Sequence, residues 1–156
     1  RVSAAAGKTA EQHRAAVGQS FLVSTDNAHA VHPAHPELAD KAEAPALNGG
    51  VVVKYNANQR YVTDAFSASV FTELCREAGV AVQRYSNRPD LPGGSTLGCI
   101  AMAHLSVPAV DVGLAQLAMH SACELAGEAD TAALVRAMAV YYSKALRRAG
   151  TAVELV

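Results

Sequence analysis

The sequence lacks the long apolar runs, the one-sided charge and the paired cysteines that mark several large classes of protein. Polar residues break its apolar runs well before the length of a bilayer span, so we expect no transmembrane helix. A formal net charge of −1 provides no strong attraction to nucleic acid or to a membrane surface, and we expect neither as a partner. The three cysteines, an odd number without CxxC spacing, indicate reduced thiols in a cytoplasmic protein.

The first residues also lack the features of a complete chain. There is no starting methionine, and residues 1–6 are basic and then small, without the apolar block of a secretion signal. We therefore expect a processed or truncated piece of a longer protein. Its 156 residues, of which 51% are hydrophobic, are enough for one domain with a core of its own.

Short apolar runs alternate with helical patterns through most of the chain. The expected strands cover residues 21–23, 51–55, 80–85 and 107–112. The expected helices cover residues 9–19, 64–78, 93–103 and 130–148. Ser95 or Thr96 is expected to cap the third helix, and Gly79 to end the second. Strands separated by helices predict an α/β fold with helices on both sides of the sheet.

The segment from Asp26 to Gly50 does not follow this alternation. It contains three prolines, which forbid a continuous helix or a central strand: Pro33, Pro36 and Pro45. We expect a long loop, and loops of this length in compact domains tend to be functional. His32 and His35 flank prolines within it, either as surface residues or as members of a metal cluster with the preceding Asp26 and His29.

An aspartate and a histidine stand at the ends of two separate apolar runs and form a possible metal-binding pair. His120 ends the run from Val110 to Met119, and Asp26 follows the run Phe21–Val23, with His29 three residues later. Oxygen and imidazole ligands from separate strands suit zinc or a similar divalent ion. The spacing alone is a weak signal, because most histidines and aspartates in a chain of this size are not ligands.

Two further segments allow both a binding role and a purely structural one. Gly93–Thr96 offers free backbone N–H groups at a helix start, which can bind an anion, but a glycine-assisted cap without a ligand is favoured by the motif. No lysine follows at the place that a Walker loop requires. Lys54 ends an apolar strand, where it is either a cationic floor for an acidic substrate or a solvated strand end.

Taken together, these segments resemble the aspartyl aminopeptidase family, whose members are dinuclear zinc exopeptidases. The resemblance extends from about Ser20 to Tyr142, and the order of several separate motifs makes it specific. It corresponds to the C-terminal half of the family's catalytic domain. The motifs that carry it are Asp26–Pro33 (DNAHAVHP), Lys54–Tyr61 (KYNANQRY), Gly94–Gly98 (GSTLG), Val110–Gly113 (VDVG) and Met119–Ser121 (MHS).

The resemblance implies a fold, an activity and an assembly. The fold is a zinc-exopeptidase-like three-layer α/β sandwich with a mixed sheet flanked by helices, of which residues 1–156 form an incomplete, C-terminal part. The activity is removal of N-terminal Asp or Glu residues from peptides by a zinc aminopeptidase with two zinc ions per complete site. The assembly is a homo-oligomer, expected by analogy with family members.

The resemblance also implies that part of the site lies elsewhere. The family's first histidine ligand, its bridging aspartate and its glutamate pair, which includes the general base, belong upstream of this chain. We therefore expect the upstream half of the same enzyme to complete the site, and this fragment to be inactive in isolation. The alternative is a non-catalytic fragment or scaffold subunit that retains the fold.

Three residues are expected to lie at the metal ions. By correspondence with the family, Asp26 and His120 are metal ligands, each on a different ion of the pair. His29 takes the position of the catalytic residue that contacts the substrate or the developing tetrahedral oxyanion.

Five further residues are expected to contact the substrate. Lys54 corresponds to the residue that recognises the acidic side chain, because a neutral side chain would leave its ammonium group unpaired. Tyr61 is a weaker candidate for a substrate contact. The turn formed by Gly94, Ser95 and Thr96 is expected to line the pocket with backbone donors.

Overall fold

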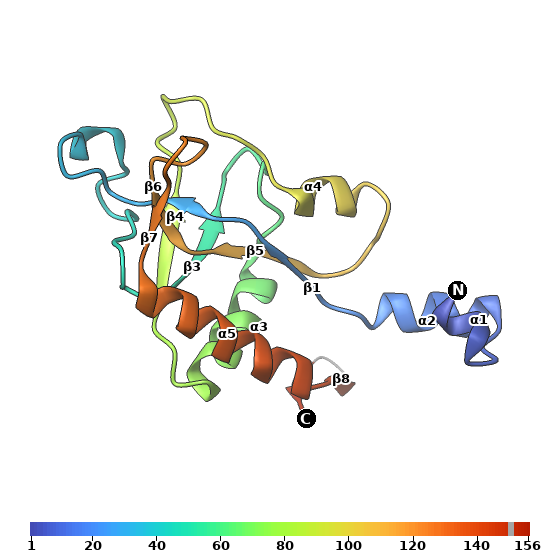
Figure 1. The fold of residues 1–156 in the computed structure, drawn as a ribbon. Coiled ribbons are helices and arrows are strands. Elements are labelled where there is room, and N and C mark those ends of the chain that lie inside the picture. The colour runs from blue at the N-terminus through green and yellow to red at the C-terminus, as the bar shows by residue number, and fades with distance from the viewer. Residues whose placement is uncertain (150–151) are drawn as a thin grey trace.

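The computed structural model describes residues 1–149 and 152–156 and is built on a four-stranded mixed sheet (Figure 1). The strands stand in the order β1 (Leu22–Thr25), β5 (Ala109–Gly113), β3 (Val51–Tyr55) and β4 (Val82–Ser86). β1 runs parallel to β5 and β3 runs parallel to β4, whereas β5 and β3 are antiparallel. The predicted mixed sheet is therefore confirmed.

Helices lie on both faces of this sheet. α3 (Ala65–Glu77) and α5 (Glu128–Ser143) pack together on one face, where Figure 1 shows them side by side. The short helix α4 (Leu97–Met102) lies on the other face, because its Gly98 approaches the side chain of Asp111, which points away from α3 and α5. The arrangement is the predicted three-layer sandwich.

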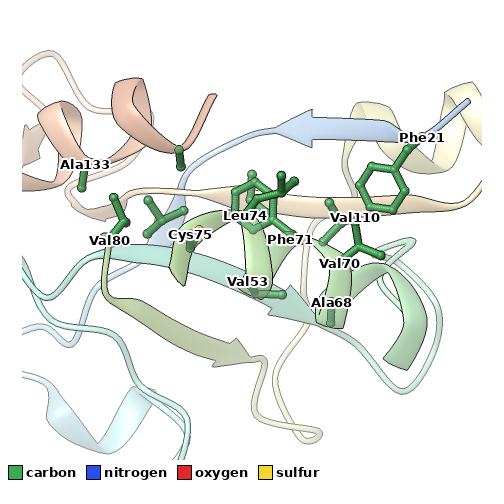
Figure 2. Packing of buried hydrophobic residues seen from close by; sticks show 13 residues of the cluster. Phe21, Val53, Ala68, Val70, Phe71, Leu74, Cys75, Val80, Val110 and Ala133 are labelled. Atoms are coloured by element: carbon green, nitrogen blue, oxygen red, sulfur yellow. The ribbon is translucent and has the colours of Figure 1, made fainter. Parts of the chain in front are cut away.

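The main hydrophobic core fills the space between the sheet and the pair α3 and α5 (Figure 2). Since successive strand side chains point to opposite faces, every second residue of β3 and β5 enters this core, while Val52, Lys54 and Asp111 point to the α4 side. The buried members of the core come from the sheet, the two helices and the segments beside them: Phe21, Val51, Val53, Ala68, Val70, Phe71, Leu74, Cys75, Val80, Val110, Val112, Ala133 and Ala137.

A smaller cluster lies on the α4 side of the sheet, where the polar residues of interest gather. It is covered in part by a second sheet with the strand order β2 (Ala28–His29), β6 (Ala115–Leu117) and β7 (Leu125–Ala126). β2 runs parallel to β6, and β6 is antiparallel to β7. The buried residues of this cluster are Ala28, Ala30, Val52, Tyr61, Tyr85 and Ala115.

Both ends of the chain form small elements outside the four-stranded sheet, and Leu146 and Leu155 near the C-terminus pack against the main core. Helices α1 (Val2–Ala5) and α2 (Ala10–Gly18) contain no buried residue and extend away from the sheet in Figure 1. Strands β8 (Leu146–Ala149) and β9 (Ala152–Leu155) form an antiparallel pair near the C-terminus. Within residues 1–149 and 152–156, no helix is both long and apolar enough to cross a membrane.

Several predicted boundaries differ from the structure. The helix expected over residues 130–148 ends at Ser143, and residues 146–148 belong to strand β8 instead. The long loop of residues 26–50 contains β2 and a 3₁₀ turn, η1 (Pro36–Leu38). α4 begins only at Leu97, and the hydroxyl of Thr96 forms no cap hydrogen bond. By contrast, α3 is followed by Gly79 at a positive φ of 62°, as predicted, and the structure adds a capping box at Asp64.

A buried carboxylate joins the start of α5 to the start of β3. The two oxygens of Asp130 accept hydrogen bonds from the backbone N–H groups of Asn48 (2.7 Å) and Gly50 (2.8 Å). Gly50 is needed there, because its φ is +106° and an added Cβ would stand 2.2 Å from the Ala81 carbonyl oxygen. Asp130 therefore fixes the turn from which β3 runs toward Lys54.

We expect Asp130→Ala to lower the free energy of unfolding by about 3 kcal/mol, because two backbone donors, the buried one of Gly50 and the partly buried one of Asn48, lose a charged acceptor. Urea unfolding of the full-length protein measures the loss. The control is Glu128→Ala, an exposed carboxylate in the same helical turn, whose replacement should change stability little. Equal stability of the two variants would contradict the anchoring role of Asp130.

Candidate metal centre

One cavity of about 420 Å³ collects all of the residues to which the family resemblance assigned a metal, catalytic or substrate role. It lies on the α4 side of the sheet, between the segment after β1, the end of β3 and the turn before α4. The predicted site residues on its wall are Asp26, His29, Lys54, Tyr61, Gly94, Ser95, Thr96 and His120. Segments that are up to about ninety residues apart along the chain thus meet at one place, which is what a binding site requires.

The topology explains why the two proposed metal ligands meet. β1 and β5 are parallel, so the segments that follow them leave the sheet at the same edge. The two segments continue side by side as β2 and β6, which pair Ala28 with Ala115 and His29 with Gln116. Asp26 lies two residues before β2, and His120 follows β6 by three residues.

Gly113 allows the Asp26 segment to approach the end of β5. A Cβ at position 113 would stand 2.0 Å from the Asp26 carbonyl oxygen and 2.8 Å from the Cα of Asn27. Asn27 strengthens the contact, because its side-chain oxygen accepts the backbone N–H of Leu114 (3.1 Å) and its amide donates to Gln116 (2.7 Å). These contacts hold the backbone at residues 26 and 27 against residues 113–116.

Lys54 is a buried cation that is bound to the same segment. Its side chain is 3% exposed, and Nζ donates to Oδ2 of Asp26 (3.3 Å), to the Asp26 carbonyl (3.3 Å) and to the Asn27 carbonyl (3.0 Å). Nζ also lies 4.6 Å from the centre of the Tyr61 ring. Burial lowers the pKa of Lys54, while the charges of Asp26 and Asp111 act in the opposite direction.

The two histidines of the site differ in their settings. Partial burial, followed by the positive charges of Lys54 and His120, lowers the pKa of His29, and only the charge of Asp26 raises it. The neutral imidazole, which can accept a hydrogen bond or a metal ion, is thereby favoured. His120 is exposed and has a φ of +68°, and its backbone N–H donates to Oε1 of Glu124 (2.6 Å).

The remaining predicted residues line the same cavity. Tyr61 is buried, and this burial is the main reason that the pKa of its hydroxyl lies above the usual value, so the group stays neutral. Gly94 and Ser95 are exposed in the turn before α4, and Thr96 is buried, with its hydroxyl donating to Asp111. Because α4 has only six residues, the anion-binding alternative for this turn has little helix dipole to support it.

The donors present are suited to a metal ion but are few. Among residues 1–149 and 152–156, no group of three or more His, Cys, Asp or Glu side chains could hold a metal ion. A carboxylate and an imidazole are the ligand types that zinc accepts, and a complete site needs at least three protein ligands. His32 and His35 line a neighbouring cavity of about 340 Å³ that also reaches His29.

Asp111 is a buried polar residue beside the site for which the sequence predicted no role. The motif VDVG was recognised, but no role was given to its aspartate, which has no exposed surface. The available signal was a lone carboxylate inside a run of valines, since a charge is rarely buried in a strand without partners.

We expect Gly113→Ala to displace residues 26 and 27 and to lower the free energy of unfolding by about 3 kcal/mol, because the new Cβ overlaps backbone atoms that cannot rotate away. Chemical denaturation of the full-length protein measures this. Gly18→Ala serves as the matched control, since a Cβ there would meet no atom of residues 1–149 or 152–156 within 4 Å. Unfolding of the Gly113 variant at the same urea concentration as the unaltered protein would show that the approach is not tight.

Comparison with known proteins gives consistent matches. The family model described as aminopeptidase I zinc metalloprotease (M18) matches residues 1–142. A probable M18 family aminopeptidase 2 of Mycobacterium tuberculosis is 45% identical over 149 residues, which cover 96% of this chain and 34% of the relative. The chain thus spans about a third of the length of the curated relatives that it matches.

Solved structures show the same fold. A structure of the Ape4 and Nbr1 complex contains a chain that matches with a TM-score of 0.84 and 34% identity, over 87% of this chain and 26% of that one. The S. cerevisiae mApe1 dodecamer matches with a TM-score of 0.74 and 25% identity, over 83% and 28% of the two chains. The chain belongs to the aminopeptidase I zinc metalloprotease (M18) family.

Proposed function

We propose that this chain is the C-terminal part of the catalytic domain of a zinc aminopeptidase that removes N-terminal acidic residues from peptides. One observation carries the proposal: all the residues that the sequence assigned to metal and substrate line a single cavity. Membership of a zinc metalloprotease family supports the metal and the class of reaction.

Within this proposal Asp26 and His120 are the metal ligands of this chain, each serving a different zinc ion. Zinc, when bound, lowers the pKa of a coordinated water to near neutrality and polarises the peptide carbonyl. The half-exposed carboxylate of Asp26 is available for this role, since only its Oδ2 contacts Lys54. His29 contacts the substrate or its developing oxyanion, as its lowered pKa and its place on the same wall support.

The acidic preference is assigned to Lys54, the cation at the floor of the cavity. In a partly dry pocket a carboxylate side chain compensates this charge, whereas a neutral side chain does not. Lys54 also positions the segment that carries Asp26, because its Nζ contacts three oxygens of residues 26 and 27. Tyr61 and the turn Gly94–Thr96 complete the substrate wall.

The complete enzyme needs more than this chain. The remaining metal ligands and the general base are assigned to the upstream half of the same protein, in keeping with the third of the relatives' length that the chain spans. A homo-oligomer is proposed by analogy with the dodecamer of S. cerevisiae mApe1. Free thiols at all three cysteines support a cytoplasmic location.

We expect the full-length protein to bind about two zinc ions per chain and to hydrolyse aspartyl and glutamyl anilides. Asp26→Ala and His120→Ala should each remove about one ion, because each residue serves a different metal. Zinc is counted by atomic absorption after exhaustive dialysis. A full-length protein that retains its fold but neither binds zinc nor hydrolyses these anilides would favour the scaffold alternative.

We expect Lys54→Met to lower the ratio of kcat/KM for aspartyl to that for leucyl anilide by about tenfold or more, because only the acidic substrate uses the ammonium group. The ratio is independent of how much active enzyme survives. Lys41→Met, which replaces an exposed lysine, is the matched control. An unchanged ratio in the Lys54 variant would overturn the assignment. The role of Lys54 would then be limited to its contacts with residues 26 and 27.

A further inference from the structure

Asp111 is a fully buried carboxylate that the proposed function does not use. It lies in the middle of β5, on the face that carries the cavity, but it is not among the residues that line the cavity. Its Oδ2 accepts two hydrogen bonds, one from the backbone N–H of Val62 (2.7 Å) and one from Oγ1 of Thr96 (2.9 Å). Hydrogen bonds to a charged acceptor are the stronger kind.

The backbone of Asp111 binds one of these segments a second time. Its N–H donates to Oγ1 of Thr63 (2.9 Å). β3 pairs with β5 only at Val112 and Gly113. At Asp111 residues 62 and 63 therefore form the hydrogen bonds in place of β3. The strand therefore fixes this loop through both its backbone and its side chain.

The two segments that Asp111 joins both carry predicted substrate contacts. Val62 directly follows Tyr61, and Thr96 ends the turn that begins at Gly94. They are more than thirty residues apart along the chain. Besides Asp111, Arg60 donates to the Gly93 carbonyl, and Sγ of Cys99 in α4 donates to the Arg60 carbonyl (2.9 Å). Asp111 is the buried point at which the Tyr61 loop and the Gly94–Thr96 turn are held to the sheet together.

Helix α4 packs closely against the carboxylate of Asp111. A Cβ on Gly98 would stand 2.8 Å from Oδ1 of Asp111. The close approach of α4 to the carboxylate therefore requires glycine at this position. Oδ1 is buried and has no hydrogen-bond partner among the described residues, which means that the two bonds to Oδ2 must offset the cost of burying the group.

We propose that Asp111 is a positioning residue, which joins the Tyr61 loop and the Gly94–Thr96 turn into one rigid wall for the substrate. It acts through these segments, because its carboxylate does not reach the cavity. The role in substrate binding rests on the function proposed above. The mechanical link between the two segments rests on the hydrogen bonds alone.

The experiment compares Asp111→Asn, Asp111→Leu and Ser24→Ala in the full-length enzyme. Asparagine keeps one oxygen that can accept both bonds, whereas leucine keeps the bulk and removes them. Ser24 is buried and pairs with Asp111 in the register of β1 and β5, and its hydroxyl has no hydrogen-bond partner in the described part of the chain. Its replacement therefore controls for a change on this face of the sheet. Each variant is assayed for KM, kcat and zinc content.

We expect Asp111→Leu to raise KM for the aspartyl anilide by about tenfold, with kcat and zinc content within about twofold of the unaltered enzyme. Asp111→Asn should raise KM by less than about threefold, and Ser24→Ala should leave it unchanged. A destabilised fold would instead lower kcat and zinc content without changing KM. That pattern, or an Asn variant as impaired as the Leu variant, would overturn the proposal.

Amide hydrogen exchange tests the link without any assay of activity. In Asp111→Leu, residues 60–63 and 94–97 should exchange faster together, while residues 26–29 keep their rate. Faster exchange in only one segment, or in neither, would overturn the link even if the enzyme is active. If the unaltered enzyme shows no peptidase activity but the two segments respond together, the proposed function fails and the link stands. If Asp111→Leu does not fold, Thr96→Val removes one bond and should still speed exchange at residues 60–63.

Discussion

The candidate site depends on the hydrogen bonds that the buried ammonium group of Lys54 donates to the Asp26 segment. This group stands at the end of the central strand β3, and it binds three oxygens of the segment that carries Asp26. Its position follows from the alternation of β3, since Val51 and Val53 enter the core while Val52 and Lys54 face the other side. A buried cation needs anionic or carbonyl partners, and Asp26 and Asn27 supply them. The main core and the candidate site thus lie on opposite faces of the same strand.

Much of the fold was predictable from the sequence because its signals are local. The valine run at residues 51–53 gave the central strand, and Asp64 with Gly79 gave both ends of α3. The ends of other elements were set by tertiary contacts. The pattern of residues 130–148 remained helical past Ser143, but Leu146 packs against the main core as part of a strand.

The candidate site was predictable as a set of residues, because the motifs that carry them follow the family in type and order. The hydrogen bonds between them were not, because these depend on distances that no spacing encodes. Thr96 shows the difference: its type and place suggested a helix cap, but its hydroxyl binds Asp111 instead. Lys54 was expected to face a substrate, and the structure adds its contacts with residues 26 and 27.

β1 is the last strand at its side of the four-stranded sheet. Its four residues use one edge to pair with β5, and the opposite edge presents backbone N–H and C=O groups to whatever lies beside it. Such an edge is a template for another strand. Residues 1–156 would therefore tend to pair with a further strand along this side of β1.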